Sequence, residues 1–249
     1  MKILISDKMS DKVEDVLKSK QIDYDIKTGM SPEELKGVID QYDGILIRSA
    51  TKLTSDILSD CNNLKVIGRA GVGVDNVDLD QATKNRILVM NTPLGNLEAT
   101  AELSVGLMFS IMRNIHLAND STHQGKWEKP KFLGTELKGK VLGIVGYGNI
   151  GQRVAEICST IGMKIITNSK SASDDDLSKF GVKKVSTEDL IKDADIISLH
   201  TKLNDETKYM INKETISTMK PTSVIINCAR GGLINDCLLY TSDAADDLF

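Results

Sequence analysis

The sequence GYGNIG, at residues 146–151, is the first part of the chain whose residue types and spacing could do chemistry. The apolar run VLGIV, typical of a buried strand, stands directly before it, and a helical pattern follows. In such a strand–turn–helix, Gly146 permits a tight turn, Gly148 lets the backbone approach a pyrophosphate, and Gly151 lets the helix pack on the strand. The free N–H groups and the dipole of the helix N-terminus favour the same anion. The motif therefore predicts a dinucleotide-binding site.

The ribose end of this predicted site departs from the usual pattern. An Asp or Glu normally follows the glycines by about 20 residues and binds the ribose hydroxyls. Here Ser169 stands at that position, with Lys170 beside it. A carboxylate would repel a 2′-phosphate, whereas hydroxyl and ammonium groups tolerate one. The residues at this end of the site therefore leave the choice between NAD and NADP open, with a site that accepts either cofactor as one hypothesis.

The elements that must position these residues alternate between short apolar runs and helical stretches. Repeated strand–helix–strand units imply parallel sheets with right-handed crossovers. A break near residues 91–96 predicts two doubly wound α/β domains, at residues 1–93 and 94–236. A long helix is expected over residues 96–124, and Asp174–Asp176 is expected in a solvated loop. The predicted strands are residues 2–6, 22–26, 44–47, 64–68, 87–91, 141–145, 164–167, 195–199 and 223–227.

The composition excludes several classes of protein. With a formal net charge of −4, the chain lacks the basic surface of a nucleic-acid-binding protein. No run of about 18 apolar residues predicts a membrane span, and the N-terminus lacks the pattern of a secretory signal. The 4 cysteines show no C-x-x-C spacing, so neither a metal site nor a disulfide framework is expected. The chain is predicted to be a globular cytoplasmic protein.

Several segments give the chain a resemblance to a known family. They are IRSATKLT (47–54), GRAGVGVDNVDLDQAT (68–83), MNTPLGN (90–96), GKWEKPKFLGTELKGKVLGIVGYGNIG (125–151) and INCARGGLIND (226–236). On these residues the chain resembles the D-isomer-specific 2-hydroxyacid dehydrogenases. The resemblance implies a substrate domain, a Rossmann NAD-binding domain with the reaction in the cleft between them, and a homodimer built on residues 96–124. GKWEKPKFLGTEL is similar to the branch of the family that acts on 3-phosphoglycerate, so a phosphorylated 2-hydroxy acid is the expected substrate.

The resemblance also implies roles for individual residues. Arg230 matches the catalytic arginine, which binds the carboxylate and the keto oxygen of the substrate. Arg48 matches a residue that contacts the distal phosphate, an anion that suits the planar guanidinium fork. The GVG loop, residues 71–73, matches a loop whose N–H groups bind the substrate carboxylate. The implied substrate contacts are Arg48, Ser49, Gly71, Val72 and Gly73, and the implied cofactor contacts are Val72, Gly146, Gly148, Asn149, Ile150, Gly151, Ser169, Thr201, Cys228, Ala229 and Arg230.

The proton acceptor of this chemistry is not among the motifs. Oxidation of a 2-hydroxy acid moves a hydride to nicotinamide while a base takes the hydroxyl proton. The family uses a His with a Glu partner, both further along the chain than Arg230, and no residue of this chain matches either one. His116 and His123 are expected to be exposed or structural, and His200 is expected to line the cofactor side rather than act as the base.

The match to the family ends after Asp236. The segment CLLYTSDAADD that follows matches the translation of a common sequencing-library adapter. We therefore expect residues 237–249 to be non-native and the second domain to be incomplete at its C-terminal end. The fragment itself is then expected to be inactive and poorly soluble.

Two other functions stay open. One is another D-2-hydroxyacid dehydrogenase, such as a glyoxylate or hydroxypyruvate reductase, which would depend much less on Arg48. The other is a non-catalytic, NAD-sensing dimer, which fits a chain that lacks the Glu and the His.

Overall fold

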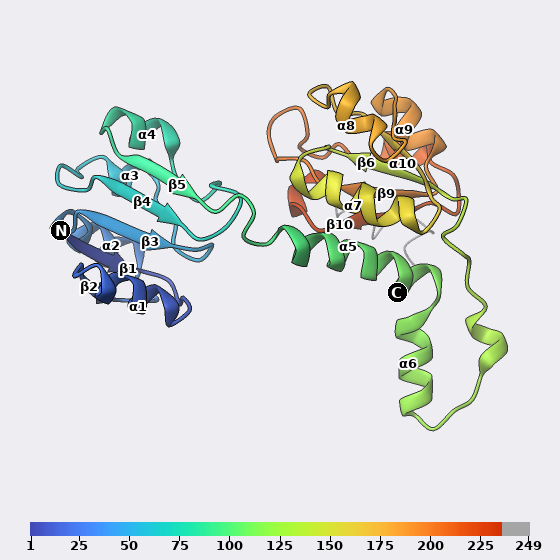
Figure 1. The fold of residues 1–249 in the computed structure, drawn as a ribbon, viewed down its shortest axis with the longest axis horizontal. Helices are drawn as coiled ribbons and strands as arrows, with labels where there is room; N and C mark the ends of the chain where they lie inside the picture. Colours follow the sequence, from blue (N-terminus) through green and yellow to red (C-terminus); the bar gives the residue numbers. More distant parts are fainter. Residues whose placement is uncertain (236–249) are drawn as a thin grey trace. The chain divides into compact units, whose positions relative to one another are not determined.

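The chain forms two compact units in a computed structural model that describes residues 1–235 (Figure 1). The first unit is Met1–Asn96, and the second begins at Leu97. The segment expected to be non-native, residues 237–249, lies outside the described residues. Within the described residues, no helix is long and apolar enough to cross a membrane.

A 5-stranded parallel sheet forms the centre of the first unit, in the order β2-β1-β3-β4-β5. Strand addition changes direction at β1, which pairs with β2 on one side and with β3 on the other. This is the order of a doubly wound sheet. The elements are β1 (Lys2–Ile5), α1 (Lys12–Ser19), β2 (Asp23–Ile26), α2 (Pro32–Val38), η1 (Ile39–Gln41), β3 (Gly44–Ile47), α3 (Ser55–Leu58), β4 (Val66–Arg69), α4 (Leu79–Lys84) and β5 (Leu88–Asn91).

Both faces of the first sheet are buried, because successive side chains of a strand point to opposite faces. Leu4, Ile45 and Ile67 belong to the larger apolar cluster, which also holds residues of α2, α3 and α4. On the opposite face, Ile3 packs in a smaller cluster with Leu17 of α1. Burial on two faces explains why the strands read as continuous apolar runs rather than as alternating ones.

The second unit is built on another 5-stranded parallel sheet, in the order β10-β9-β6-β7-β8. Its direction changes between β6 and β9, so this sheet is doubly wound as well. The predicted fold class, two doubly wound parallel sheets, is confirmed. The elements are α5 (Leu97–Met112), α6 (Ile115–His123), η2 (Lys129–Phe132), β6 (Val141–Val145), α7 (Asn149–Thr160), β7 (Lys164–Thr167), α8 (Asp174–Ser178), β8 (Lys183–Lys184), α9 (Thr187–Asp193), β9 (Ile196–Leu199), α10 (Lys213–Thr218), β10 (Val224–Asn227) and η3 (Gly231–Leu233).

Helices cover both faces of this second sheet. α5 and α7 lie side by side on one face, where Val154 and Cys158 of α7 pack with Leu142 and Ile144 of β6 (Figure 1). The opposite face carries α9 and α10, whose apolar side chains join a cluster with β9. This packing fixes the first turn of α7 against the end of β6, where the sequence GYGNIG lies.

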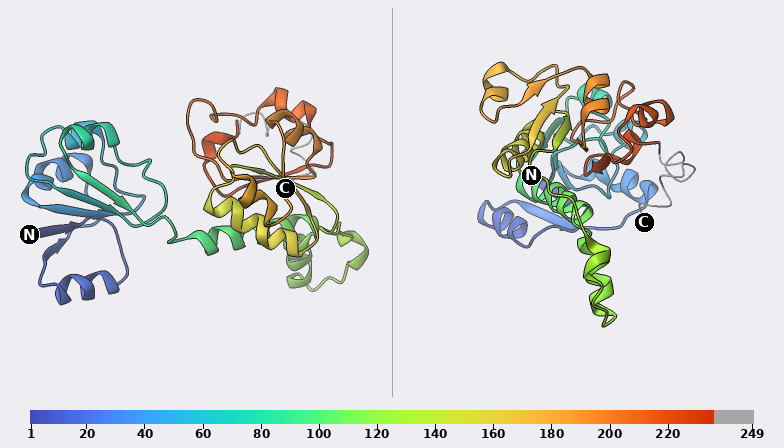
Figure 2. Two further views of the ribbon diagram at one scale, coloured as in Figure 1. Left: turned by 45° about the horizontal axis from the view of Figure 1, so that its top comes forward. Right: turned by 90° about the vertical axis from the view of Figure 1, so that its right-hand side faces the viewer.

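The prediction of one helix over residues 96–124 is wrong. The structure has two helices, α5 and α6, and Asn114 between them adopts the left-handed conformation with φ 52°. Asn is among the few non-glycine residues that adopt this conformation readily, and it ends helices for that reason. The chain turns at this point, and α6 leaves the sheet instead of continuing along it (Figure 2).

The charged run Asp174–Asp176 is the first turn of helix α8 and not the solvated loop that was predicted. The hydroxyl of Ser173 accepts the N–H of Asp176 as an N-cap. Acidic side chains in the first turn stabilise a helix, because they lie near the positive end of the helix dipole. Their exposure, which the prediction also implied, holds for Asp174 and Asp175.

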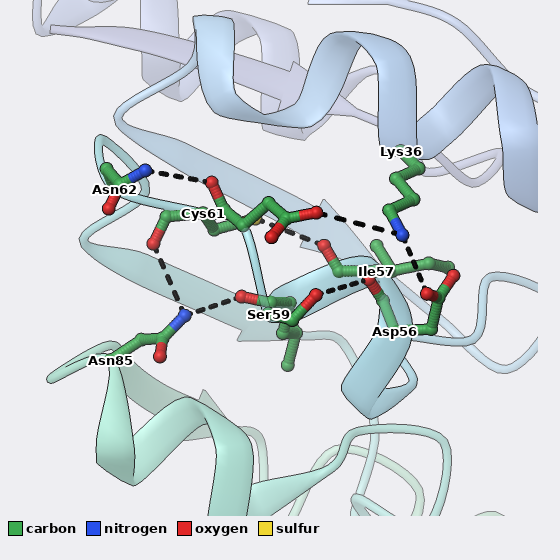
Figure 3. A network of polar contacts seen from close by, with 9 residues as sticks. Lys36, Asp56, Ile57, Ser59, Cys61, Asn62 and Asn85 are labelled. Carbon is green, nitrogen blue, oxygen red and sulfur yellow. Dashed lines mark hydrogen bonds and ion pairs between the residues drawn. The ribbon is translucent and has the colours of Figure 1, made fainter.

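A network of polar contacts connects the helices that pack in the larger apolar cluster of the first unit (Figure 3). The side-chain amide of Asn85, just after α4, donates to the carbonyl groups of Leu58 and Cys61. Lys36 of α2 lies 2.6 Å from a carboxylate oxygen of Asp56 in α3. Burial raises the pKa of the Cys61 thiol to about 11, so this cysteine stays protonated and unreactive. These contacts tie α2, α3 and the end of α4 to one another.

Candidate functional site

Loops leave the carboxyl edge of the second sheet after four of its strands. Residues 146–151 follow β6, residues 168–170 follow β7, residues 200–201 follow β9 and residues 228–230 follow β10. Because these strands are parallel and adjacent, the loops lie along a single edge. The switch point of the sheet, between β6 and β9, is where doubly wound sheets bind ligands. The structure therefore gathers on one edge the cofactor contacts predicted in this unit.

Close backbone contacts shape the glycine loop. Gly146 has φ 89°, and a Cβ built on it would lie 2.7 Å from the carbonyl oxygen of His200. A Cβ on Gly151 would overlap the carbonyl oxygen of Gly146, whereas a Cβ on Gly148 would meet nothing within 4 Å. The packing of the protein therefore requires glycine at the first and third positions of the motif. At the second position, Gly148, the backbone is open to a ligand.

Helix α7 begins at this open position. Its N-cap is Gly148, and no side chain of residues 1–235 caps the first N–H groups of the 12-residue helix. Such N–H groups, together with the positive end of the helix dipole, bind phosphate. Asn149 is exposed and Ile150 is partly buried in the first turn. These residues fit the pyrophosphate of a dinucleotide.

Ser169, at the position of the usual acid, is partly buried just beyond β7. Buried Thr167 donates its hydroxyl to the carbonyl of Ile144 at 2.8 Å and accepts the N–H of Ser169 at 3.3 Å. The position of Ser169 is therefore tied to the neighbouring strand β6. The ammonium group of Lys184 lies 3.3 Å from the carbonyl oxygen of Lys170, which adds a second cation beside this loop.

His200 and Thr201 adjoin the glycine loop at the end of β9. The Nε2 atom of His200 lies 2.8 Å from the Ser198 hydroxyl, and burial lowers the pKa of the imidazole to about 4. A group this weakly basic is a poor proton acceptor near neutral pH. The prediction that His200 lines the site fits this environment better than a role as the base. The other histidines are exposed, as predicted: His116 and His123.

Asn227, the last residue of β10, shapes the loop that carries Arg230. Its side chain accepts the N–H of Ala229 at 3.1 Å and donates to the carbonyl of Arg230 at 2.9 Å. Because β10 pairs with β9, Cys228 leaves the edge beside His200. The partly buried Arg230 donates from Nη1 to the carbonyl of Ala229 at 2.9 Å, so part of its guanidinium is held by its own loop.

The GVG loop, residues 71–73, follows β4 in the first unit. Its first two carbonyl groups accept the N–H of Thr92 at 3.0 Å and the side-chain amide of Asn91 at 2.7 Å. A Cβ on Gly71 would overlap the guanidinium of Arg69, whose buried Nε has no hydrogen-bond partner among the described residues. A cation thus lies directly against the loop that is expected to bind a carboxylate.

Arg48 and Ser49 follow β3 on the same edge of the first sheet, and both are exposed. The Nη1 atom of Arg48 lies 3.4 Å from the carbonyl oxygen of Lys8. Within residues 1–235, Arg48 forms no ion pair, which was the alternative explanation for an arginine at this position. Its guanidinium is available to an anion.

The sequence did not predict the side chains that anchor these loops. Asp7 and Asn76 bond the loop of Arg48, Asn91 bonds the GVG loop, and Asn227 bonds the loop of Arg230. All four are Asp or Asn, and all but Asn76 lie at or just after the end of a strand, where such residues favour turns. The sequence carries no other signal for them. In the described part of the chain, no group of His, Cys, Asp or Glu could hold a metal ion.

A doubly wound sheet with a glycine turn and an uncapped helix N-terminus at its switch point defines a Rossmann-type dinucleotide-binding domain. Residues 105–244 match the NAD binding domain of the D-isomer specific 2-hydroxyacid dehydrogenases, and the chain belongs to this family. The resemblance found in its motifs is thereby confirmed.

Individual relatives agree with this assignment. D-3-phosphoglycerate dehydrogenase of Synechocystis sp. is 42% identical over 241 residues, which cover 97% of this chain and 43% of that protein. D-lactate dehydrogenase of Aquifex aeolicus, solved with NAD and lactic acid, has a TM-score of 0.85 and 31% identity, covering 96% of this chain and 72% of that one. An acyclic imino acid reductase solved with NADPH and D-Arg has a TM-score of 0.88 and 29% identity, covering 97% and 78%. The chain spans about half the length of the curated relatives it matches.

Proposed function

We propose that this chain is part of an enzyme that oxidises D-3-phosphoglycerate to 3-phosphohydroxypyruvate with NAD, the first step of L-serine synthesis. The observation that carries the proposal is the open, uncapped start of α7 at Gly148, which fits a pyrophosphate. The substrate is proposed from the 42% identity to a D-3-phosphoglycerate dehydrogenase. A cytoplasmic location is part of the proposal, and the buried free thiols Cys61 and Cys158 suit a reducing compartment.

The proposed roles follow the charge that moves in the reaction. A bound nicotinamide would supply the acceptor for the hydride that leaves C2 of the substrate. Arg230 binds the substrate carboxylate and the C2 oxygen, where its positive charge stabilises the developing carbonyl. The N–H groups of residues 71–73 bind the carboxylate, and Arg48 with Ser49 binds the phosphate. The hydroxyl proton passes to a base other than His200, because that imidazole has a pKa of about 4.

Replacement of Arg48 separates the proposed substrate from its rivals. Arg48→Leu should weaken the binding of 3-phosphoglycerate by about 10-fold to 100-fold, because a charge-assisted contact with phosphate is lost. Binding of glyoxylate and of unphosphorylated D-glycerate should change by less than about threefold. Titration calorimetry on the purified chain measures both. An affinity for 3-phosphoglycerate that does not change would favour a glyoxylate or hydroxypyruvate reductase, which depends much less on Arg48.

The non-catalytic alternative, an NAD-sensing dimer, is tested at the level of the gene. The source DNA is read past the codon for Asp236 from an independent library. A frame that continues to a Glu and then a His supports the dehydrogenase. The same residues 237–249 followed by a stop codon would favour the sensor.

We propose that the dinucleotide site accepts NADP as well as NAD. The loop after β7 offers the Ser169 hydroxyl and the ammonium groups of Lys170 and Lys184, with no carboxylate at position 169. NADH and NADPH should bind with affinities within about tenfold of each other, measured by nicotinamide fluorescence. Ser169→Asp should lower the affinity for NADPH selectively, because its charge repels the 2′-phosphate. A strong preference of the unaltered chain for NADH would contradict this proposal.

We propose a homodimer formed through residues 96–124, as the family resemblance implies. The supporting observation is a set of large apolar side chains on α5 and α6 that water would otherwise contact. Large apolar side chains that are exposed together on an element are typical of an interaction site. Sedimentation velocity at micromolar concentration should give a dimer, and a monomer would contradict the proposal. The exposed residues are Leu103, Leu107, Ile115 and Leu117.

A further inference from the structure

The carboxylate of Asp7 joins the two ends of the loop Arg48–Thr51 through hydrogen bonds. Asp7 directly follows β1, and only 7% of its surface is exposed. Its Oδ2 accepts the N–H of Arg48 and, at 3.2 Å, the N–H of Thr51, so one oxygen joins the two ends of the loop. Its Oδ1 accepts the Thr51 hydroxyl at 2.9 Å. Every hydrogen bond of this buried carboxylate goes to the same short loop.

The side chain of Asn76 also joins the two ends of this loop, through their carbonyl groups. Its Nδ2 donates to the carbonyl of Arg48 at 2.7 Å and to the carbonyl of Thr51 at 2.6 Å. The terminal residues of the loop therefore have both their N–H and their carbonyl groups satisfied by two side chains. One comes from the segment after β1 and the other from the segment after β4.

The middle of the loop is left free. Ser49 and Ala50 are exposed, and within residues 1–235 no acceptor bonds the N–H group of either one. Successive free N–H groups in a turn form an anion-binding concavity. The Arg48 guanidinium, also exposed, stands at the start of the same loop. The loop is thus held in one conformation while its anion-binding groups stay available.

We propose that Asp7 and Asn76 are positioning residues, which hold this loop ready for the distal phosphate of the substrate. The inference rests on the proposed function, because it takes 3-phosphoglycerate as the ligand. A loop that is ordered before binding loses less conformational entropy when the ligand arrives, which increases affinity. The role of Asp7 is geometric: its carboxylate is satisfied by three donors of the protein and does not touch the phosphate.

Two substitutions at Asp7 separate geometry from charge. Asp7→Ala removes all three bonds and should weaken binding of 3-phosphoglycerate by about tenfold. Asp7→Asn has the same shape: its oxygen can accept both N–H groups, and its amide can donate to the Thr51 hydroxyl, which also accepts. Its affinity should stay within about threefold of the unaltered chain. Asn76→Ala is an independent variant at the other side of the loop and should resemble Asp7→Ala.

Asp40→Ala is the matched control. Asp40 also accepts two backbone N–H groups in the first unit, from Asn62 and Asn63, each at 2.7 Å. Those residues precede β4, so they lie at the opposite edge of the sheet from the loop. This variant should lose stability in urea unfolding, because two backbone N–H groups lose their acceptor, without any change in 3-phosphoglycerate affinity.

The measurement is titration calorimetry of each variant with 3-phosphoglycerate and with unphosphorylated D-glycerate. The proposal expects Asp7→Ala and Asn76→Ala to lose affinity for the phosphorylated ligand only, because a general loss of structure would lower both. If these variants bind 3-phosphoglycerate as tightly as Asp40→Ala does, or lose both ligands equally, the positioning role is wrong. If the unaltered chain binds 3-phosphoglycerate no better than D-glycerate, the proposed substrate fails and the inference fails with it.

Discussion

The two glycine loops of the molecule, residues 71–73 and residues 146–151, are held in place by different means. In the second unit, a side chain on Gly146 or Gly151 would run into backbone atoms. In the first unit, a side chain on Gly71 would run into the end of the Arg69 side chain. Backbone cannot move without moving an element, whereas a guanidinium can rotate.

This difference separates two ways of preparing a binding loop. The loop of the second unit is fixed by the packing of α7 on the end of β6, so its shape is a property of the fold. The loops of the first unit are fixed by single side chains, such as Asn91 on the GVG loop and Asp7 on the loop of Arg48. The first kind of loop suits a cofactor shared by a whole family. The second kind depends on hydrogen bonds from individual side chains outside the loop.

Gly151→Ala should produce the largest effect. Its methyl group would overlap the carbonyl oxygen of Gly146, so the first turn of α7 must move away from the sheet. We expect the free energy of unfolding of the second unit to fall by about 3 kcal/mol. Urea unfolding followed by circular dichroism, with amide hydrogen exchange to assign the loss to the second unit, measures it. Stability equal to that of the unaltered chain would remove the proposed difference between the loops.

Acid should destabilise the second unit at a higher pH than the first, because of His200. Its folded-state pKa of about 4 lies below the ordinary value of 6.5, because burial disfavours the charged form. The unfolded chain takes up the proton first, so stability is fully present above pH 6.5 and is lost as the pH falls toward 4. The loss should reach about 3 kcal/mol. His200→Gln should remove this dependence in urea unfolding at pH 7 and pH 5.

The first unit contains no histidine and should respond at lower pH. The bonds from Lys2 and Tyr42 lower the pKa of Asp25, and those from Lys65 and the Lys2 backbone lower the pKa of Asp43. A carboxyl group with a lowered pKa stabilises the fold above its unfolded-state pKa, and this is lost only as the pH falls through the folded-state value. Hydrogen exchange at pH 5 should therefore open the second unit before the first. The reverse order would contradict this.

Gly71→Ala should cost much less than Gly151→Ala. The Arg69 guanidinium must leave its position, but no helix or strand has to move. We expect a loss of about 1 kcal/mol in the first unit, measured in the same urea experiment. A loss as large as that of Gly151→Ala would mean that Arg69 is as rigid as backbone. Arg69→Ala combined with Gly71→Ala should then recover the stability, since the obstructing atoms are gone.

Gly148→Ala should have the smallest effect on stability, within about 0.5 kcal/mol. Apart from the adjoining residues, no atom of residues 1–235 lies within 4 Å of the added methyl group, and the φ of −79° at this residue suits any amino acid. The same methyl group would stand between the backbone and a pyrophosphate, so NADH affinity should fall by at least about tenfold. Fluorescence titration with NADH checks this. Unchanged affinity would place the dinucleotide elsewhere.

Most of the fold could be predicted because the strands are buried on both faces. Continuous apolar runs such as VLGIV mark these strands without ambiguity. The break at Asn114 could not be predicted from periodicity, because the residues on both sides of it continue a helical pattern. Strand β8 consists of Lys183 and Lys184, and nothing in two exposed lysines indicates a strand. It forms because β7 offers a free edge.

The glycine loop could be predicted, because strand, turn and helix are contiguous in the sequence. The loop anchors could not, since Asp7 and Arg48 meet only after β1 and β3 have paired. Asn76 reaches the same loop from the segment after β4. A sequence motif contains only residues that are close together in the chain. The side chains that anchor a binding loop come from distant segments, which meet only when their strands pair.

The two outer strands of the second sheet differ in a way that affects how the protein behaves at high concentration. β8 is a pair of exposed lysines, and such short, charged edges resist pairing with a strand of another molecule. β10, with the sequence VIIN, is 4 residues long and largely apolar, and among the described residues it has one strand neighbour, β9. Among the described residues, β10 is therefore the edge better suited to pair with an added strand, and β8 the edge that resists it.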